Sequence, residues 1–379
     1  MIGRSVPQSS PPAISLCRRV VADESVPSPT SLCAPAEKQR VSVIVCSYAE
    51  ERIHELAQCL GSLDAQTRHA EEILLVIDHN PRLLQQARTQ FSGLRILENN
   101  RSRGASGARN CGVAHARGDI VAFLDDDTSA DPDWLEELIQ PYEDRAVLGT
   151  TGRVLARWPD RRPSWFPPEF DWVVGCSYRG MPESTVPVRN LWGPMSLRRA
   201  AVEEAGGFNE AIGLVNRNGL GCEETELSIR IQARYPSEVF LYVPVARTTH
   251  HLDAPRTTRR YFVRRCYGEG VSKAAVAASV GAHRALATER TYTARVLPAG
   301  VARGLKQALS GHLSGLGAAT MIVVGLATTT AGYLRGRLTA FQLSRHGPRP
   351  VEQVSSSPSH DADLHTVNHR LTHGFDNGK

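Results

Sequence analysis

Three consecutive carboxylates, Asp125, Asp126 and Asp127, directly follow a short apolar run, Ile120 to Leu124. A glycine before the run and a proline after it are typical of the bounds of a buried β-strand. Adjacent carboxylates repel one another, and each is costly to bury without a counter-charge. Oxygen ligands at the end of a rigid strand suit a hard divalent cation, Mg2+ or Mn2+, which commonly also binds substrate phosphates. By itself, the triplet fits an acidic surface turn that caps the next helix equally well.

A second acidic group, Glu223 and Glu224, follows a loop with glycines at 219 and 221 and opens a stretch of helical periodicity. The glycines let the backbone approach a substrate closely, and a carboxylate there can accept the proton of a hydroxyl group. The same residues are also typical of an ordinary helix, whose first turn favours negative charge. The glutamates alone do not decide between these two interpretations.

Alternating elements position the acidic residues of the first half. The pattern predicts strands at 41–48, 72–78, 94–98 and 120–124, and helices at 50–63, 83–91 and 105–116. This alternation predicts an α/β fold with a mostly parallel central sheet flanked by helices. Because ligands of such sheets bind where the strands end, we expect Tyr48, Asp78 and the aspartate triplet to share one crevice. Asp78 also suits a turn-forming position before an Asn-Pro pair.

The second half is less regular. We expect an extended, loop-rich segment at 153–190, a helix at 199–205, a strand at 239–243 and helical structure at 258–290. His250 and His251 follow that strand, where an imidazole could complete a metal shell with carboxylates. A pair of histidines satisfied by ordinary hydrogen bonds is the alternative.

An uncharged segment from 313 to 334 is long enough to span a bilayer. Gly, Ala, Thr and Ser dilute its hydrophobicity, so a buried or interfacial helix fits the segment as well as a membrane span does. Arg335 and Arg337 at its end suit anionic headgroups. We therefore expect peripheral membrane contact through residues 313–337.

Composition narrows the class of protein. The net charge is only +5, and no cluster of arginines is interleaved with aromatics, so we expect no nucleic-acid partner. The eight cysteines show no C-x-x-C pairing, which favours a reducing cytoplasm, with the protein at the cytoplasmic face of the membrane. The first 40 residues are rich in Ser and Pro and carry no apolar segment of signal-peptide length.

Several motifs in order resemble the family 2 glycosyltransferases of the GT-A fold, which transfer a sugar from a nucleoside-diphosphate donor. The resemblance covers roughly residues 41–270. The motifs are the strand ending in Ser47-Tyr48, the Asp78 strand end, the turn and helix from Asn100 to Gly112, the D-x-D at Asp125-Asp126-Asp127, the segments Trp192–Arg199 and Gly206–Glu210, and the Glu223-Glu224 pair. Two additional residues precede Gly104, and Pro194 stands where the family usually has Asn.

The resemblance implies roles for these residues. Donor binding would fall to Ser47, Tyr48, Asp78, Gly104, Arg109, Asn110, Asp125 and Asp126. Asp125 and Asp127, with His250, would hold Mn2+ or Mg2+. Glu224 would be the catalytic base, with Glu223 as the alternative because the family's usual Asp is Glu here. For Arg109 and Asn110, a purely structural helix N-terminus is the competing interpretation.

The resemblance implies a metal-dependent hexose transfer that inverts the anomeric centre. We expect transfer of a single sugar, because the Q-x-x-R-W motif of processive synthases is absent. The default donor is a UDP-sugar, with GDP- and dTDP-sugars left open. The acceptor would be a hydroxyl of a glycan or lipid-linked glycan of the cell envelope. We expect a disordered leader at 1–40, a GT-A domain at 41–270 with a nucleotide-sugar half at 41–150 and an acceptor half at 151–270, a helical extension at 271–344 and a disordered tail at 345–379.

Three other classes compete with this interpretation. An aspartyl-phosphate-type phosphatase also places D-x-D after a strand, but it needs a downstream lysine, and none lies between Asp127 and Lys273. A nucleotidyltransferase would carry a lysine in a glycine-rich loop after the first strand, which this chain lacks. A catalytically inactive sugar-nucleotide-binding protein would keep the fold without needing an intact Asp triplet and Glu224.

Overall fold

The computed structural model describes residues 39–211, 221–280 and 291–345. The expected leader up to residue 38, Gly219, the end of the expected helical stretch at 281–290 and the tail beyond 345 lie outside the described residues. The described helices are α1 (Ile53–Asp64), α2 (Pro81–Gln90), α3 (Ala105–His115), α4 (Trp134–Ile139), α5 (Arg199–Glu204), α6 (Glu223–Arg234), α7 (Arg259–Val280), α10 (Leu297–Leu309) and α11 (Ser314–Arg345). Short helical turns are η1 (Glu50–Arg52), η2 (Gln140–Glu143), η3 (Pro168–Val174), η4 (Ala254–Thr257) and η5 (Tyr292–Val296).

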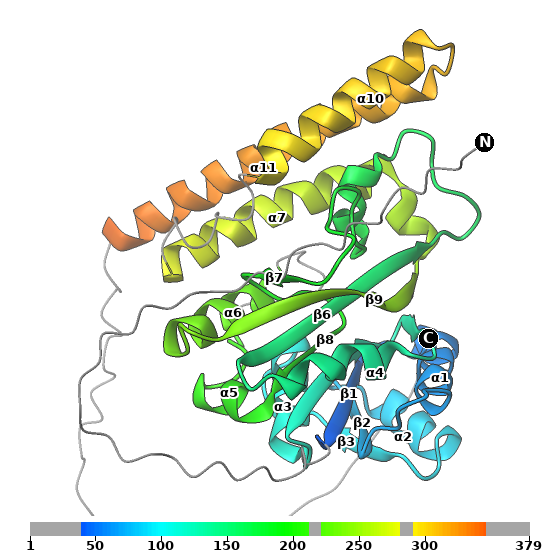
Figure 1. Ribbon diagram of the computed structural model, residues 1–379, viewed down its shortest axis with the longest axis vertical. Helices are drawn as coiled ribbons and strands as arrows, with labels where there is room; N and C mark the ends of the chain where they lie inside the picture. Colours follow the sequence, from blue (N-terminus) through cyan, green and yellow to red (C-terminus); the bar gives the residue numbers. More distant parts are fainter. Residues whose placement is uncertain (1–38, 212–220, 281–290, 346–379) are drawn as a thin grey trace, which may run out of the picture. The chain divides into compact units, whose positions relative to one another are not determined.

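The described strands form one nine-stranded sheet in the order β3-β2-β1-β4-β8-β6-β9-β5, with β7 also paired to β9. Figure 1 shows the first strands at the lower end of the sheet and the long strands β6 and β9 crossing above them. The strands are β1 (Val41–Ser47), β2 (Glu72–Ile77), β3 (Arg95–Glu98), β4 (Ile120–Asp125), β5 (Thr128–Ala130), β6 (Val147–Arg157), β7 (Val186–Val188), β8 (Met195–Arg198) and β9 (Val239–His251).

The first four strands of this order, β3, β2, β1 and β4, run parallel, as the alternation of apolar strands and helices predicts. Both faces of β1 are buried. Val43 and Val45 pack with α1, α2 and α4 on one face, and Ile44 packs with α3 and α6 on the other. Because the strand is covered on both sides, its sequence is continuously apolar rather than alternating. Because β3, β2, β1 and β4 run parallel, their carboxyl ends meet at one edge of the sheet.

The later strands make the sheet mixed rather than mostly parallel. Antiparallel pairings join β8 to β4 and β6, and β5 and β7 to β9, while β6 and β9 run parallel. The expectation of a loop-rich segment starting at 153 is wrong for its first residues, since β6 continues to Arg157. Strand β9 likewise runs on to His251 rather than stopping at Val243. This extension brings the end of β9 beside β5 and the aspartate triplet.

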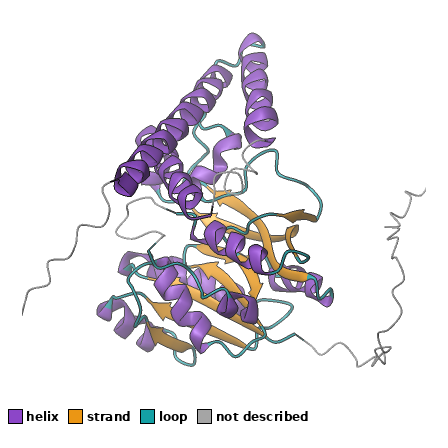
Figure 2. Cartoon of the chain, turned by 90° about the vertical axis from the view of Figure 1, so that its left-hand side faces the viewer, coloured by secondary structure: helices purple, strands orange, loops and turns teal. Residues whose placement is uncertain are grey.

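Three helices, α7, α10 and α11, pack together beside the sheet (Figures 1 and 2). Their backbones approach closely at glycines. A Cβ atom at Gly270 of α7 would collide with the carbonyl of Thr329 in α11, and one at Gly304 of α10 would collide with the carbonyl of Gly315. Within the described residues, one helical segment, Ser314–Thr339, is long and apolar enough to cross a membrane, with a mean hydropathy of 1.4 and 33% of its most apolar stretch buried.

Candidate active site

The aspartate triplet forms the turn between β4 and β5. Asp125 ends β4 with 52% of its side chain exposed, whereas Asp126 and Asp127 are buried. Asp126 accepts hydrogen bonds from the Ser47 hydroxyl at 2.6 Å and from Arg52 at 3.1 Å. Burial, reinforced by the neighbouring charge of Asp127, raises the pKa of Asp126 to about 6. Ser47, at the end of β1, therefore helps to fix the position of Asp126.

Asp127 lies in the most positive part of this site. Its Oδ2 is 3.1 Å from Arg52, 3.2 Å from Arg256 and 3.2 Å from His250 Nε2. Arg256 also lies 2.7 Å from that same His250 nitrogen. Burial favours the neutral acid, but His250 and the two arginines outweigh it and hold the pKa of Asp127 well below its usual range. Thr128 pairs with His250 across β5 and β9, which fixes the approach of the imidazole to the carboxylate.

The donor atoms of Asp127 and His250 fit a divalent cation. A carboxylate oxygen and an imidazole nitrogen 3.2 Å apart can both face one ion, and Mn2+ accepts both kinds of ligand. No cluster of three His, Cys, Asp or Glu side chains suited to a metal was found among the described residues. A cation held here would therefore complete its shell with substrate oxygens, as Mg2+ sites on phosphate substrates commonly do. The guanidinium of Arg256 now contacts both donor atoms.

Arg109 links the triplet to the glutamate pair. It lies in α3 with 8% of its side chain exposed, and it contacts Glu223 at 3.0 Å, Glu224 at 2.9 Å and Asp125 at 3.5 Å. Its guanidinium also lies over the ring of Phe208, 5.5 Å from the centroid. Residues about 100 positions apart in the sequence are thus gathered around one buried cation.

The two glutamates at the start of α6 differ in exposure. The side chain of Glu223 is 4% exposed and that of Glu224 is 16% exposed. Burial, assisted by the charge of Glu224 and opposed by Arg109, raises the pKa of Glu223 to about 7. Among the described residues, Oε2 of Glu223 has no hydrogen-bond partner. Glu224 is therefore the more accessible of the two carboxylates.

Asp78, at the end of β2, anchors the loop that precedes α3. Its Oδ2 accepts a hydrogen bond from the Gly104 amide at 2.9 Å, and its Oδ1 accepts one from Asn99 at 2.7 Å. Gly104 caps α3 with a φ of 119°, which strongly favours glycine. Tyr48, 45% exposed at the neighbouring end of β1, has its ring 5.6 Å from the Arg52 guanidinium. Tyr48 and Asp78 therefore lie at the carboxyl ends of the neighbouring strands β1 and β2, and their sharing one crevice stays a prediction.

Asn110 connects α3 to the Gly-Gly-Phe-Asn-Glu segment. Its amide nitrogen donates to the Phe208 carbonyl at 2.8 Å and to Glu210 at 3.0 Å, and its Oδ1 accepts from the Phe208 amide at 2.8 Å. A Cβ atom at Gly207 would collide with Asn110, so close packing requires glycine there. Asn110 is buried and fully engaged within the protein, and its contacts position the segment around Phe208.

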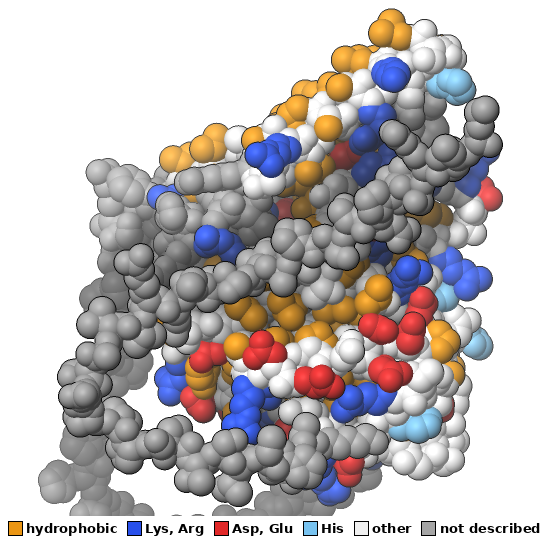
Figure 3. Space-filling model, viewed as in Figure 1, with side chains coloured by type: hydrophobic (Ala, Val, Ile, Leu, Met, Phe, Trp, Pro, Cys, Tyr) orange, Lys and Arg blue, Asp and Glu red, His pale blue; other side chains and the backbone are white. Residues whose placement is uncertain are grey.

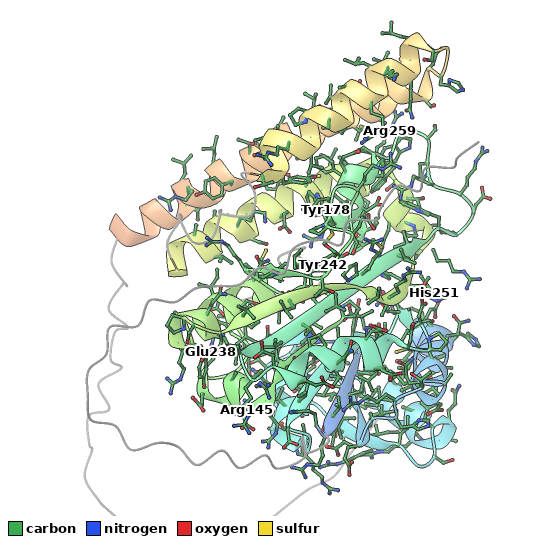
Figure 4. The ribbon with its side chains drawn as sticks, viewed as in Figure 1. Arg145, Tyr178, Glu238, Tyr242, His251 and Arg259 are labelled. Carbon is green, nitrogen blue, oxygen red and sulfur yellow. The ribbon has the colours of Figure 1, made fainter. Side chains whose placement is uncertain are left out.

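Sequence reasoning missed two cations of the site, Arg52 and Arg256. Arg52 lies only four residues after the expected aromatic residue Tyr48, so the sequence near Tyr48 could have indicated it. Arg256 belongs to a basic stretch that carries no distinguishing pattern in the sequence, and it reaches Asp127 only because β9 continues to His251. His251 lies at the same strand end (Figure 4), where its ring nitrogen Nε2 is 3.0 Å from the Ser129 hydroxyl and its backbone amide donates to the Asp127 carbonyl at 2.9 Å.

Comparisons with known proteins identify the family. The family described as Glycosyl transferase family 2 matches residues 42–206. A glucosyl-dolichyl phosphate glucuronosyltransferase of Haloferax volcanii is 34% identical over 239 residues, which are 62% of this chain and 76% of that protein. The chain belongs to the family 2 glycosyltransferases. This confirms the family and the enzyme class that the motifs predict.

Two further similarities were found, one to a sequence and one to a solved structure. The succinoglycan biosynthesis protein ExoM of Rhizobium meliloti is 31% identical over 138 residues, covering 35% of this chain and 44% of ExoM. The solved mannosyltransferase PcManGT of Pyrobaculum calidifontis, in complex with GDP-Man and Mn2+, superposes with a TM-score of 0.50 at 18% identity, covering 79% of this chain and 88% of that structure. The GT-A fold is therefore confirmed for this family 2 glycosyltransferase.

Proposed function

We propose that this glycosyltransferase moves one sugar from a nucleoside-diphosphate sugar to an acceptor hydroxyl, with inversion at the anomeric carbon. The observation that carries the proposal is the position of Arg109. It contacts Asp125 of the triplet and both Glu223 and Glu224, so the expected donor-side and acceptor-side carboxylates lie in one site. A single displacement needs a charged leaving group on one side and a base on the other, and the two clusters suit these roles.

Glu224 is the proposed catalytic base. Its carboxylate is the more exposed of the pair, so an acceptor hydroxyl can reach it and pass its proton to it during attack on the sugar. Glu223 is buried and has a raised pKa, which suits a group that fixes Arg109 better than one that must be ionised. The single Arg109 guanidinium holds both carboxylates close to Asp125.

The proposed metal ligands are Asp127 and His250, with the exposed carboxylate of Asp125 beside them. Mn2+ or Mg2+ would neutralise negative charge on the leaving diphosphate when it is bound. The chain's own cations, Arg52 and Arg256, already offset the charge of Asp127 in the absence of substrate. The PcManGT complex contains Mn2+ together with a nucleotide sugar, which supports the same donor chemistry in this fold.

The nucleotide of the donor is proposed to lie over the strand ends. Tyr48 offers an exposed ring at the end of β1, and stacking on a base is a common use of such a ring. Asp78 holds the loop at Gly104 that borders this position. We take a UDP-sugar as the first donor to test. In this proposal residues 41–150 bind the donor and residues 151–270 bind the acceptor.

The acceptor is proposed to be a lipid-linked glycan at the cytoplasmic face of a membrane. The relative from Haloferax volcanii is named for action on a glucosyl-dolichyl phosphate. In this chain, α11 presents an exposed apolar face that includes Leu316, Val323, Leu334 and Leu338. Peripheral contact through residues 313–337 would hold the site near such an acceptor.

The test is nucleotide release from a panel of UDP-, GDP- and dTDP-sugars with Mn2+ and the purified full chain. We expect one nucleotide sugar to be hydrolysed slowly and to be transferred when the matching acceptor is added. Glu224→Gln should lower the rate by about a thousandfold, since general bases contribute on this scale, while Glu203→Gln, an exposed carboxylate of α5, should not. An unaffected Glu224→Gln variant would place the base elsewhere, and release of phosphate from simple phosphoesters would contradict the transferase chemistry.

A further inference from the structure

Both carboxylate oxygens of Asp78 have partners within the protein. Its Oδ2 accepts a hydrogen bond from the Gly104 amide at 2.9 Å, and its Oδ1 accepts one from Asn99 Nδ2 at 2.7 Å. The ring nitrogen Nδ1 of His79 lies 2.8 Å from the same Oδ1. Asp78 is only 7% exposed, so a ligand has little access to either oxygen. The aspartate at the end of β2 therefore serves as an internal anchor.

His79, the next residue, has an unusual backbone conformation. Its φ is 50°, and among the described residues Cys222 is the other non-glycine residue with a positive φ. Histidine adopts this conformation more often than most side chains do, and such conformations gather at functional sites. Asn80 fixes the following turn, because its side chain accepts from the Leu83 amide at 3.0 Å and donates to the Tyr48 carbonyl at 3.0 Å. His79 therefore sits in a defined position at the end of β2.

The second ring nitrogen of His79 is available to a ligand. The side chain is 39% exposed, and no hydrogen bond or ion pair within the described ranges reaches Nε2. A carboxylate only accepts hydrogen bonds, so the hydrogen of the neutral imidazole lies on Nδ1, beside Asp78. In that tautomer Nε2 carries a lone pair and accepts hydrogen bonds. The end of β2 thus offers one oriented acceptor.

This acceptor lies next to the aromatic ring proposed to hold the nucleotide base. Strands β1 and β2 are paired in parallel, with Ser47 opposite Ile77, so Tyr48 and His79 leave the sheet at the same edge. The hydrogen bond from Asn80 to the Tyr48 carbonyl ties the two chain segments together. A base stacked on the exposed Tyr48 ring would turn its hydrogen-bonding edge sideways, and β2 is the neighbouring strand on one side.

We propose that Nε2 of His79 accepts a hydrogen bond from the ring N–H of the donor's base, while Asp78 fixes the imidazole. Uracil and thymine carry this N–H at N3, and guanine carries it at N1. Cytosine and adenine instead have a bare acceptor nitrogen at these positions. A site built to accept from a substrate N–H rejects analogues that lack it. This inference rests on the proposed donor chemistry and assigns recognition of the base to His79 rather than to Asp78.

Matched nucleotides test the assignment. Titration calorimetry with the full chain and Mn2+ compares UDP with CDP, and GDP with ADP, because the members of each pair differ at this ring nitrogen. In the pair that binds more tightly, wild type should favour the member with the ring N–H by about tenfold, the effect of one hydrogen bond. Equal affinity for the two members would overturn the inference. If wild type binds none of the four nucleotides, the proposed donor chemistry fails, and this inference fails with it.

Two substitutions of His79 show whether its ring makes the distinction. His79→Asn tolerates the positive φ and keeps an amide donor for Asp78, but it is too short to reach the base, so the preference should disappear. His79→Gln places an amide oxygen near the former Nε2 and should retain part of the preference. An unchanged preference in His79→Asn would overturn the inference and return recognition of the base to Asp78.

A matched control comes from another exposed histidine. Figure 3 shows histidine side chains exposed over the elements of the parallel half of the sheet. His69 is exposed in the loop that enters β2, at the opposite end of that strand from His79. His69→Asn should bind all four nucleotides like the wild type. Thermal unfolding of His79→Asn and His69→Asn should match that of wild type, so that a change in base preference reflects the site and not the fold.

Discussion

The two acidic clusters of the active site are neutralised in different ways. The arginines of the aspartate triplet, Arg52 and Arg256, come from the short turns η1 and η4, and their side chains are 22% and 19% exposed. The arginine of the glutamate pair, Arg109, comes from α3 in the middle of the fold and is 8% exposed. Peripheral cations can move aside at low cost, whereas a buried one cannot be removed without leaving charges unpaired.

This difference indicates how the site works. At the triplet, the proposed divalent cation would replace the arginines beside Asp127 and carry the donor diphosphate with it. At the glutamate pair, the buried guanidinium of Arg109 stays in place and fixes the position of Glu224. One cluster is therefore suited to bind and release a charged donor, and the other is suited to keep a base in a constant position through turnover.

The largest expected effect comes from removing Asp127, the proposed metal ligand of the aspartate triplet. Asp127→Asn should lower sugar transfer by about a thousandfold, because charge stabilisation by a metal ion contributes several kcal/mol. The same variant should fail to quench the electron paramagnetic resonance signal of free Mn2+ in the presence of UDP, whereas wild type quenches it. Wild-type Mn2+ binding by Asp127→Asn would show that the cation does not depend on this carboxylate.

Removing the cation of the glutamate pair should lower the folding stability of the protein. Arg109→Met leaves Glu223, Glu224 and Asp125 without their shared cation and should lower the free energy of unfolding by about 3 kcal/mol. Arg52→Met is the matched control at the aspartate triplet and should cost only about 1 kcal/mol, because Arg256 still pairs with Asp127. Urea unfolding followed by circular dichroism measures both. Equal losses would remove the distinction between the two clusters.

The site at Asp127 and His250 should bind a divalent cation more tightly when Arg256 is removed. Arg256 contacts both Asp127 and His250, so Arg256→Gln should tighten Mn2+ binding in the absence of nucleotide by about tenfold, which corresponds to about 1.4 kcal/mol. Titration calorimetry with Mn2+ alone is the measurement. Arg247→Gln, at the middle of β9, serves as a charge-matched control. Weaker Mn2+ binding by Arg256→Gln would mean that this arginine supports the metal site rather than occupying it.

A further expected effect is a pH dependence of the folding stability that comes from Glu223. Burial raises the pKa of its carboxyl group from 4.5 to about 7, so the folded protein holds this proton more tightly than the unfolded chain. The stabilisation from Glu223 is therefore complete at low pH and is lost as the pH rises through this range. Thermal unfolding of wild type should show this loss relative to Glu223→Gln, which cannot ionise. Parallel pH profiles for the two proteins would contradict the raised pKa.

Local sequence signals predicted the parallel half of the fold. Apolar runs such as Val41–Ser47 and Ile120–Leu124 need no distant partner to be recognised, and the residues at their ends were placed in one crevice for that reason. The sequence did not predict β6, which passes through a segment of Thr, Gly and Arg, and it predicted only the first residues of β9, which Pro244 interrupts. Strand β6 and the second part of β9 are specified by tertiary pairing rather than by an apolar run.

The sequence predicted the acidic residues of the site together with Arg109 and His250, but it did not predict the arginines that pair with Asp127. The sequence near Asp127 does not predict its contact with Arg256, which is 129 positions away. The contacts of Asp78 and Asn110 also depend on loops that only the fold brings together, at Gly104 and at Phe208. Residue types can predict which chemistry is present, whereas counter-charges and anchors follow from the packed structure.

Crystals of the full chain soaked with UDP and Mn2+ test the central claim most directly. The account predicts an anomalous manganese peak bound by Asp127 and His250, a diphosphate on the same ion, and Arg256 displaced from its present contacts. An empty site, with Asp127 still paired to Arg256 at saturating UDP and Mn2+, would contradict it.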